Sequence, residues 1–163
     1  MSNLDHPSVM RVRAWLADAS SPAEVIELNE TARSAQDAAD SIDTELGSIV
    51  KSLVFAVAGK PVMALVAGDR QCDTKALAVA LGLDGKVKRA DADLVREATG
   101  FAIGGVSPVA HETKLPIVID ASLARFETVY AAAGHPYCVF ATSVAELARI
   151  TGAEIKEGIG TAG

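Results

Sequence analysis

Two adjacent apolar segments constrain the fold of this chain more than any other feature. They are LVFAVA at residues 53–58 and PVMALVA at residues 61–67, and only Gly59-Lys60 separates them. Short apolar runs joined by a two-residue connection that contains glycine are typical of a β-hairpin. The sequence therefore predicts two neighbouring antiparallel strands here.

Further helices and strands alternate along the rest of the chain. Apolar periodicity and capping residues predict helices at residues 8–19, 34–42, 44–50, 74–81, 92–99 and 144–151. Apolar runs bounded by turn residues predict strands at residues 25–28, 101–103 and 115–120, and a second hairpin at 127–131 and 137–141. Such a mixture indicates an α/β or α+β domain in which helices flank a mixed, mostly antiparallel sheet.

Particular residues mark the ends of the predicted helices. Asp73, Asp91 and Ser143 each precede an apolar-periodic segment and are typical N-caps, and Ser143 with Glu146 forms a capping-box pattern. Gly82, Gly100 and Gly152 follow three of these segments, where glycine commonly ends a helix.

The length of 163 residues fits one domain. A chain of this size buries about two thirds of its unfolded surface, so it needs no metal or disulfide to fold. We expect residues 1–19 to form an N-terminal helix packed on the domain, residues 20–157 to form the domain itself, and residues 158–163 to be a flexible tail.

Composition and charge exclude several classes of protein. A formal net charge of -6 argues against broad, sequence-independent nucleic-acid binding, although Lys86, Lys88 and Arg89 cluster in one segment. The sequence contains neither an apolar run of the length of a transmembrane helix nor a secretory signal pattern, so we expect a cytoplasmic protein without membrane contact. Cys72 and Cys138 form no CxxC motif, which favours buried thiols over a redox site.

Lys51 is the first candidate functional residue. It lies in IVKSLVFAV, where a short predicted helix meets a strongly apolar strand. A lysine at a strand end can present its ammonium as a fixed charge to a phosphate or a carbonyl oxygen. The alternative is a lysine whose aliphatic stem merely covers the strand end.

The second candidate is the segment TGFAIGGVSPVAH at residues 99–111. Gly104-Gly105 permits a close backbone approach, so N–H groups can point at a ligand, and Pro108 would stiffen the loop. An ordinary tight turn is the alternative. The Walker A and dinucleotide-binding glycine patterns are absent, and Ser107 has no evident base to activate it as a nucleophile.

The remaining polar candidates are ambiguous on sequence alone. His6, His111 and His135 lack metal-ligand spacing, so we expect no metal; His111 is close enough to Pro108 to line a pocket, whereas His135 falls in a predicted exposed turn. Asp120 either caps a helix starting at Ala121 or contacts a substrate amine. Thr31 either caps the helix that follows or faces the pocket.

Taken together, these segments resemble the YbaK/ProRS-associated editing-domain family. The resemblance is carried by Thr31-Ala32-Arg33, by residues 49–55 around Lys51, by Thr99 to Pro108, by Leu115-Pro116 and by Asp120, in that order. It covers residues 20 to 155. No single motif is specific, but the ordered set is.

The resemblance implies both an activity and a set of site residues. It implies the editing-domain fold and hydrolysis of the ester that joins an amino acid to the terminal adenosine of tRNA, without metal or cofactor. The essential lysine falls on Lys51 and the GxxxP loop falls on Gly104 to Pro108, whose Gly104 and Gly105 would hold the substrate carbonyl. The predicted substrate-binding residues are Thr31, Ser52, Ser107, Pro108, His111 and Asp120.

Two departures from the family's Cys-tRNA-clearing branch bear on the substrate. That branch carries Ser-Gly-Gly where this chain has Ala132-Ala133-Gly134, and Thr where this chain has Ser52. We therefore expect a small residue such as alanine on tRNA(Pro). The expected partners are the 3' end of a mischarged tRNA and a synthetase, with the protein a monomer or a dimer. The alternatives are a non-catalytic module that binds aminoacyl-tRNA or aminoacyl-adenosine, and a small-molecule hydrolase unrelated to tRNA.

Overall fold

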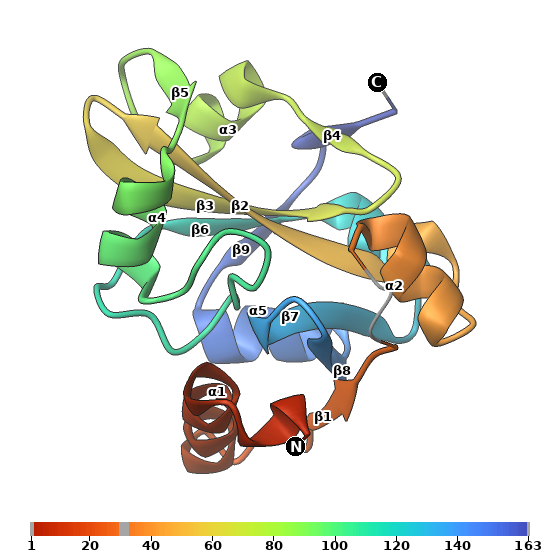
Figure 1. Cartoon of the computed structure of the whole chain (residues 1–163). Helices are drawn as coiled ribbons and strands as arrows, with labels where there is room; N and C mark the ends of the chain where they lie inside the picture. Colours follow the sequence, from red (N-terminus) through yellow and green to blue (C-terminus); the bar gives the residue numbers. More distant parts are fainter. Residues whose placement is uncertain (1, 30–32, 163) are drawn as a thin grey trace.

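The computed structural model describes residues 2–29 and 33–162 and is built around one mixed sheet (Figure 1). Its strands are β1 (Glu24–Glu27), β2 (Ile49–Val57), β3 (Lys60–Ala67), β5 (Val87–Arg89), β6 (Ile117–Asp120), β7 (Val129–His135), β8 (Cys138–Thr142) and β9 (Glu154–Lys156). Their order is β1-β8-β7-β2-β3-β6-β9, and β5 also pairs with β2. A second, two-stranded sheet joins β4 (Gln71–Cys72) to β10 (Gly160–Thr161).

The strand pairing confirms the predicted mixed, mostly antiparallel sheet. Strands β2 and β3 form the expected hairpin, with antiparallel register from Val50 opposite Ala67 to Val57 opposite Lys60. The β7–β8 hairpin and the β1–β8 and β2–β5 pairs are also antiparallel. The β2–β7, β3–β6 and β6–β9 pairs are parallel.

Three helices begin at the predicted N-caps, and two of them end at the predicted glycines. They are α1 (Pro7–Asp18), α2 (Ala35–Ser41), α3 (Thr74–Ala80), α4 (Ala92–Thr99) and α5 (Val144–Thr151), with 3-10 turns η1 (Asn3–Asp5), η2 (Leu46–Ser48) and η3 (Ala121–Arg125). The side chains of Asp73, Asp91 and Ser143 accept hydrogen bonds from backbone N–H groups in the first turns of α3, α4 and α5. Helices α4 and α5 end at Gly100 and Gly152.

Side chains alternate across the strands, so the two faces of the sheet carry different clusters. Helices α1, α4 and α5 cover one face, where the main core includes Val54, Leu65 and Phe140. The other face is covered in two parts: Leu77 of α3 packs against Phe55, and Ala38 and Ala39 of α2 pack with Ile49. Lys51 is two residues from both Ile49 and Leu53 along β2 and shares their face of the sheet, so it lies between these two smaller clusters.

Helix α1 packs closely against the sheet. Val9, Val12 and Leu16 point inward and are buried in the main core. The approach of the helix to β7 requires glycine at position 134, because a Cβ there would lie 2.7 Å from the Ser8 carbonyl oxygen. Residues at the N-terminal end of the chain are thus part of the same core as the sheet.

Residues 101–103 do not form the predicted strand. The Phe101 N–H donates to Thr99 Oγ1 at 3.1 Å, and the Gly105 N–H donates to the Ala102 carbonyl at 3.1 Å. These local bonds turn the chain where an apolar run predicted an extended segment. The prediction was wrong because it rested on hydrophobicity alone. The Phe101 side chain is buried, but its backbone lies in a bend and not in a strand.

The structure also differs from prediction at two segment ends. The helix expected at 44–50 is only the short turn η2, and Ile49 and Val50 already pair as part of β2. Residues 158–163 were expected to be a flexible tail, yet Ile159 is buried and Gly160–Thr161 pairs with β4. The backbone hydrogen bond from Asp73 N–H to the Ile159 carbonyl, at 2.7 Å, fixes this segment against the domain.

Shortening Val12 should test whether α1 contributes to the core. Val12→Ala removes two methyl groups from a fully buried position, so we expect a loss of about 2 kcal/mol in the free energy of unfolding. Met10→Ala, on the exposed side of the same helix, should change it by less than about 0.5 kcal/mol. Chemical denaturation of both variants measures this, and equal effects would contradict the packing of α1.

Candidate functional site

A cavity opens where β2 loses a neighbouring strand. On the edge away from β3, β2 pairs with β7 only at Ile49 and Val50, and it pairs with β5 only from Phe55 onward. The backbone between these two pairings faces a cavity of about 650 Å³, a size typical of small-ligand sites. Its walls come from α2, β2, the β7–β8 hairpin, β5 and the glycine loop.

The residues that line the cavity come from both faces of the sheet. They are Leu28, Arg33, Ser34, Ala35, Ala38, Ile49, Val50, Lys51, Ser52, Leu53, Val54, Arg89, Ala90, Val95, Ile103, Gly104, Val106, Tyr130, Ala132, His135, Pro136, Tyr137, Cys138 and Val139. Lys51, Ser52 and Gly104 are therefore brought together as the sequence predicted. Among the described residues, the other predicted site residues, which are Gly105, Ser107, Pro108, His111 and Asp120, do not line the cavity.

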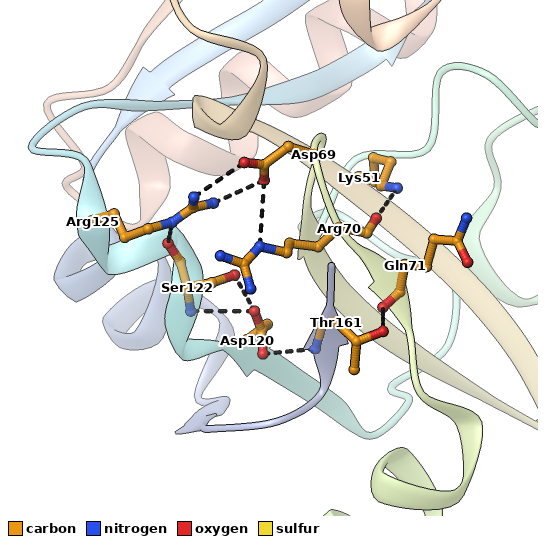
Figure 2. Close-up of polar contacts among 9 residues, drawn as sticks. Lys51, Asp69, Arg70, Gln71, Asp120, Ser122, Arg125 and Thr161 are labelled. Atoms are coloured by element: carbon orange, nitrogen blue, oxygen red, sulfur yellow. Dashed lines mark hydrogen bonds and ion pairs between the residues drawn. The ribbon is translucent and has the colours of Figure 1, made fainter. Parts of the chain in front are cut away.

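Lys51 presents a cation from the third position of β2. Its Nζ donates a hydrogen bond to the backbone carbonyl of Arg70, in the turn between β3 and β4 (Figure 2). Burial lowers the pKa of Lys51, and the positive charge of Arg89 lowers it further, while Asp69 acts in the opposite direction. Three cationic side chains, Lys51, Arg89 and Arg33, thus line one cavity, an arrangement suited to an anionic ligand or a polarised carbonyl.

Ser52 points to the opposite face of β2 and offers a free hydrogen-bonding group. Its Oγ is buried, and no residue that the structure describes partners it. A buried hydroxyl without a partner costs free energy, so a ligand that supplies one gains from the contact. Ser52 therefore remains a predicted substrate-binding residue.

The two glycines of the loop have different roles. Gly104 has a φ of 100° and borders the cavity. Gly105 packs on the backbone of β7, where an added Cβ would lie 2.9 Å from His135 Cα, and its N–H already donates to Ala102. Of the two glycines, Gly104 is thus the one that borders the cavity, and Gly105 is the point where the loop docks on the hairpin.

Ser107 and Pro108, at the end of the loop, and His111, just after it, do not line the cavity. Ser107 is fully buried, and its Oγ accepts a hydrogen bond from the Val109 N–H at 3.2 Å. His111 Nε2 donates to the Ser107 carbonyl at 2.7 Å, and burial lowers the pKa of this histidine, which favours the neutral ring. These residues hold the loop in shape, and the burial of Ser107 argues against a nucleophilic role.

Asp120 has a structural position at the C-terminal end of β6, where η3 begins. It is buried, caps η3 through the Ser122 N–H at 3.2 Å, and accepts the Gly160 N–H at 2.7 Å (Figure 2). The helix-cap alternative is therefore confirmed, and Asp120 does not line the cavity. Thr31 lies outside the described residues.

His135 lines the cavity, although the sequence placed it in an exposed turn. Its ring contacts His6 and Tyr137, with centroids 5.0 and 5.4 Å away, and its Nδ1 accepts the Tyr137 N–H at 3.1 Å. Burial and the neighbouring His6 lower the pKa of His135, so the ring favours the neutral form. No local signal marks this histidine, because it is the packing of the glycine loop on β7 that places it beside the cavity.

The described residues offer little support for a thiol or metal mechanism. Burial raises the pKa of Cys138, which lines the cavity, to about 11, so its thiol stays protonated near neutral pH. Within residues 2–29 and 33–162, no cluster of three His, Cys, Asp or Glu side chains is arranged to hold a metal. Nor does any helix in these ranges have the length and apolar character needed to cross a membrane.

Comparison with known proteins shows relatives that cover most of the chain. The model of the aminoacyl-tRNA editing domain matches residues 29–150. The uncharacterised protein YwhH of Bacillus subtilis is 34% identical over 130 residues, which cover 78% of this chain and 80% of that protein. A candidate Cys-tRNA(Pro)/Cys-tRNA(Cys) deacylase, EbsC of Enterococcus faecalis, is 32% identical over 103 residues, 62% of each chain.

A solved structure shares the fold over nearly its whole length. It is described as a candidate trans-editing enzyme for prolyl tRNA synthetase, and it is 38% identical with a TM-score of 0.87. The superposition covers 93% of this chain and 96% of the other.

The environment of Lys51 predicts an unusual titration. Because burial and Arg89 both disfavour the ammonium, Lys51 should titrate at a lower pH than a lysine in an unstructured peptide, and Arg89→Gln should raise its pKa. NMR titration of the Lys51 side chain in the wild-type protein and in this variant measures both effects. An unchanged pKa in Arg89→Gln would show that the two cations do not interact.

Proposed function

Because the chain belongs to the aminoacyl-tRNA editing domain family, we propose that it is a trans-editing deacylase that hydrolyses the ester of a mischarged tRNA. The observation that supports this most directly is that Lys51 and Gly104 line one cavity that also contains the unpartnered hydroxyl of Ser52. A fixed cation and backbone donors can stabilise the charge that develops on an ester carbonyl. No cofactor is needed for this chemistry.

In the proposed reaction, water is the nucleophile. It adds to the ester carbonyl, the bond from that carbon to the ribose oxygen breaks, and the products are a free amino acid and a tRNA with a free ribose hydroxyl. Lys51 acts as a fixed charge for the carbonyl oxygen or a nearby phosphate, and not as a base. The protonated Cys138 thiol and the buried Ser107 both favour water over a side-chain nucleophile.

Alanine on tRNA(Pro) is our leading substrate, with cysteine as the competing one. The name of EbsC points to Cys-tRNA(Pro), but Ser52 and Ala132, where this chain departs from the Cys-clearing branch, both lie on the cavity wall. Changes in the wall alter which side chain the cavity accepts. Since a single methylene is worth only about 1–3 kcal/mol in a pocket, such positions can decide the substrate.

The proposed partners follow from the same role. The 3' end of a mischarged tRNA would enter the cavity, and a prolyl-tRNA synthetase could supply it, in line with the description of the solved structural relative. A net charge of -6 leaves the chain a weak general tRNA binder, which favours such delivery. The role in translation would place the protein in the cytoplasm.

Deacylation of a panel of mischarged tRNAs tests the proposal. We expect the wild-type protein to release alanine from Ala-tRNA(Pro) faster than cysteine from Cys-tRNA(Pro), and to spare Pro-tRNA(Pro). Lys51→Ala should reduce kcat/KM by about 10² or more, because a well-placed charge contributes on the order of 3 kcal/mol. Lys60→Ala, at the exposed first position of β3, is the matched control and should retain full activity.

The rival functions give different results in the same assay. Tight binding of a non-hydrolysable aminoacyl-adenosine analogue, with every tRNA ester left intact by micromolar protein, would establish a binding module instead. Equal activity on simple amino-acid esters, independent of the tRNA, would establish a small-molecule hydrolase.

A further inference from the structure

The ammonium of Lys51 is held by a neutral group. Its partner is the carbonyl of Arg70, and no carboxylate among the residues that the structure describes forms an ion pair with it. A carbonyl orients an ammonium without cancelling its charge, and it leaves two of the three N–H donors available. The charge of Lys51 therefore remains available to a ligand in the cavity.

A carboxylate that could cancel this charge lies in the same turn. Asp69 immediately precedes Arg70, and its negative charge influences the titration of Lys51. Both oxygens of Asp69, however, face Arg125 of η3, with Nη1 to Oδ2 at 3.0 Å and Nη2 to Oδ1 at 2.8 Å (Figure 2). A longer ion pair joins Asp69 Oδ1 to Nε of Arg70, at 3.8 Å. The Arg125 guanidinium is fixed in turn by its Nε, which donates to the Ser122 carbonyl at 2.6 Å.

The turn between β3 and β4, which contains Asp69 and Arg70, is also held at its C-terminal end. Directly after Arg70, β4 pairs with β10, so that Gln71 and Cys72 are aligned with Thr161 and Gly160. The Gly160 N–H donates to Asp120, the buried cap of η3. Figure 2 shows these contacts surrounding the turn, with Lys51 on one side and Asp120 on the other. The Arg70 carbonyl is thus presented from a segment fixed at both ends.

We propose that Asp69 and Arg125 are a positioning pair for Lys51: Arg125 holds the Asp69 carboxylate away from the ammonium, so that the Arg70 carbonyl receives Lys51 and its charge stays free for the substrate. This inference rests on the proposed function for its link to catalysis. It assigns a role to two residues outside the cavity lining. Neither residue touches the substrate.

The alternative is an ion pair that only stabilises the surface. The side chains of Asp69 and Arg125 are 35% and 37% exposed, and pairs with this much exposure contribute little to folding stability. Arg125→Ala should therefore remain folded, which thermal unfolding can verify. The two explanations differ in what happens once Asp69 is released.

A double-mutant comparison separates the two explanations. Arg125→Ala leaves Asp69 with the longer contact to Arg70, at 3.8 Å. Asp69 should then pair with Lys51, so we expect kcat for the preferred mischarged tRNA to fall about tenfold with little change in KM. In the double variant Asp69→Asn with Arg125→Ala, the Asp69 carboxylate is no longer there to capture Lys51, so most of the lost activity should return. Glu154→Gln is the matched control, because it breaks the exposed Lys156–Glu154 pair on β9.

NMR titration of Lys51 in the same proteins provides a readout that a surface ion pair would not affect. The pKa of Lys51 should rise in Arg125→Ala and return toward the wild-type value in the double variant. A double variant no more active than Arg125→Ala, or an unchanged pKa in Arg125→Ala, would overturn the inference. If the wild-type protein hydrolyses no mischarged tRNA, the proposed function fails, and the titration still decides whether Arg125 controls Lys51.

Discussion

The site depends on the way two strands share one edge of β2. Strand β7 pairs with β2 for two residues in parallel, and β5 pairs with it in the antiparallel direction from Phe55, so neither covers the backbone between. A continuous strand there would close the sheet and leave no cavity. Because consecutive residues of β2 point to opposite faces, the gap allows Lys51 and Ser52 to line one cavity from the two faces of the sheet.

The cavity concentrates positive charge within an acidic protein. Lys51, Arg33 and Arg89 line it, whereas the whole chain has a net charge of -6. Local charge of one sign in a cleft attracts an oppositely charged ligand even when the surrounding surface does not. Such an arrangement favours a ligand with one anionic end, such as a nucleotide terminus, over binding along an extended nucleic acid.

Sequence reasoning succeeded where the signal was local. The β2–β3 hairpin and the caps at Asp73, Asp91 and Ser143 follow from residues a few positions apart, and the structure has all of them. It failed where contacts join distant segments. The position of His135 depends on Gly105 meeting β7 thirty residues later in the chain, and the partner of Lys51 is a backbone carbonyl, which any residue at position 70 could supply.

The same distinction explains why the loop contributes more through its packing than through its polar side chains. Ser107 and His111 have the appearance of catalytic residues in the sequence. In the structure, however, Ser107 Oγ accepts from the Val109 N–H, and His111 Nε2 donates to the Ser107 carbonyl. Those hydrogen bonds hold the loop, and with it Gly104, in one place. Backbone groups that are already in position need no rearrangement as charge develops on a substrate. In the function that we propose, buried Ser107 and half-buried His111 therefore act by fixing the loop backbone, and the hydrolysis is carried out by water in a cavity that holds the Lys51 cation.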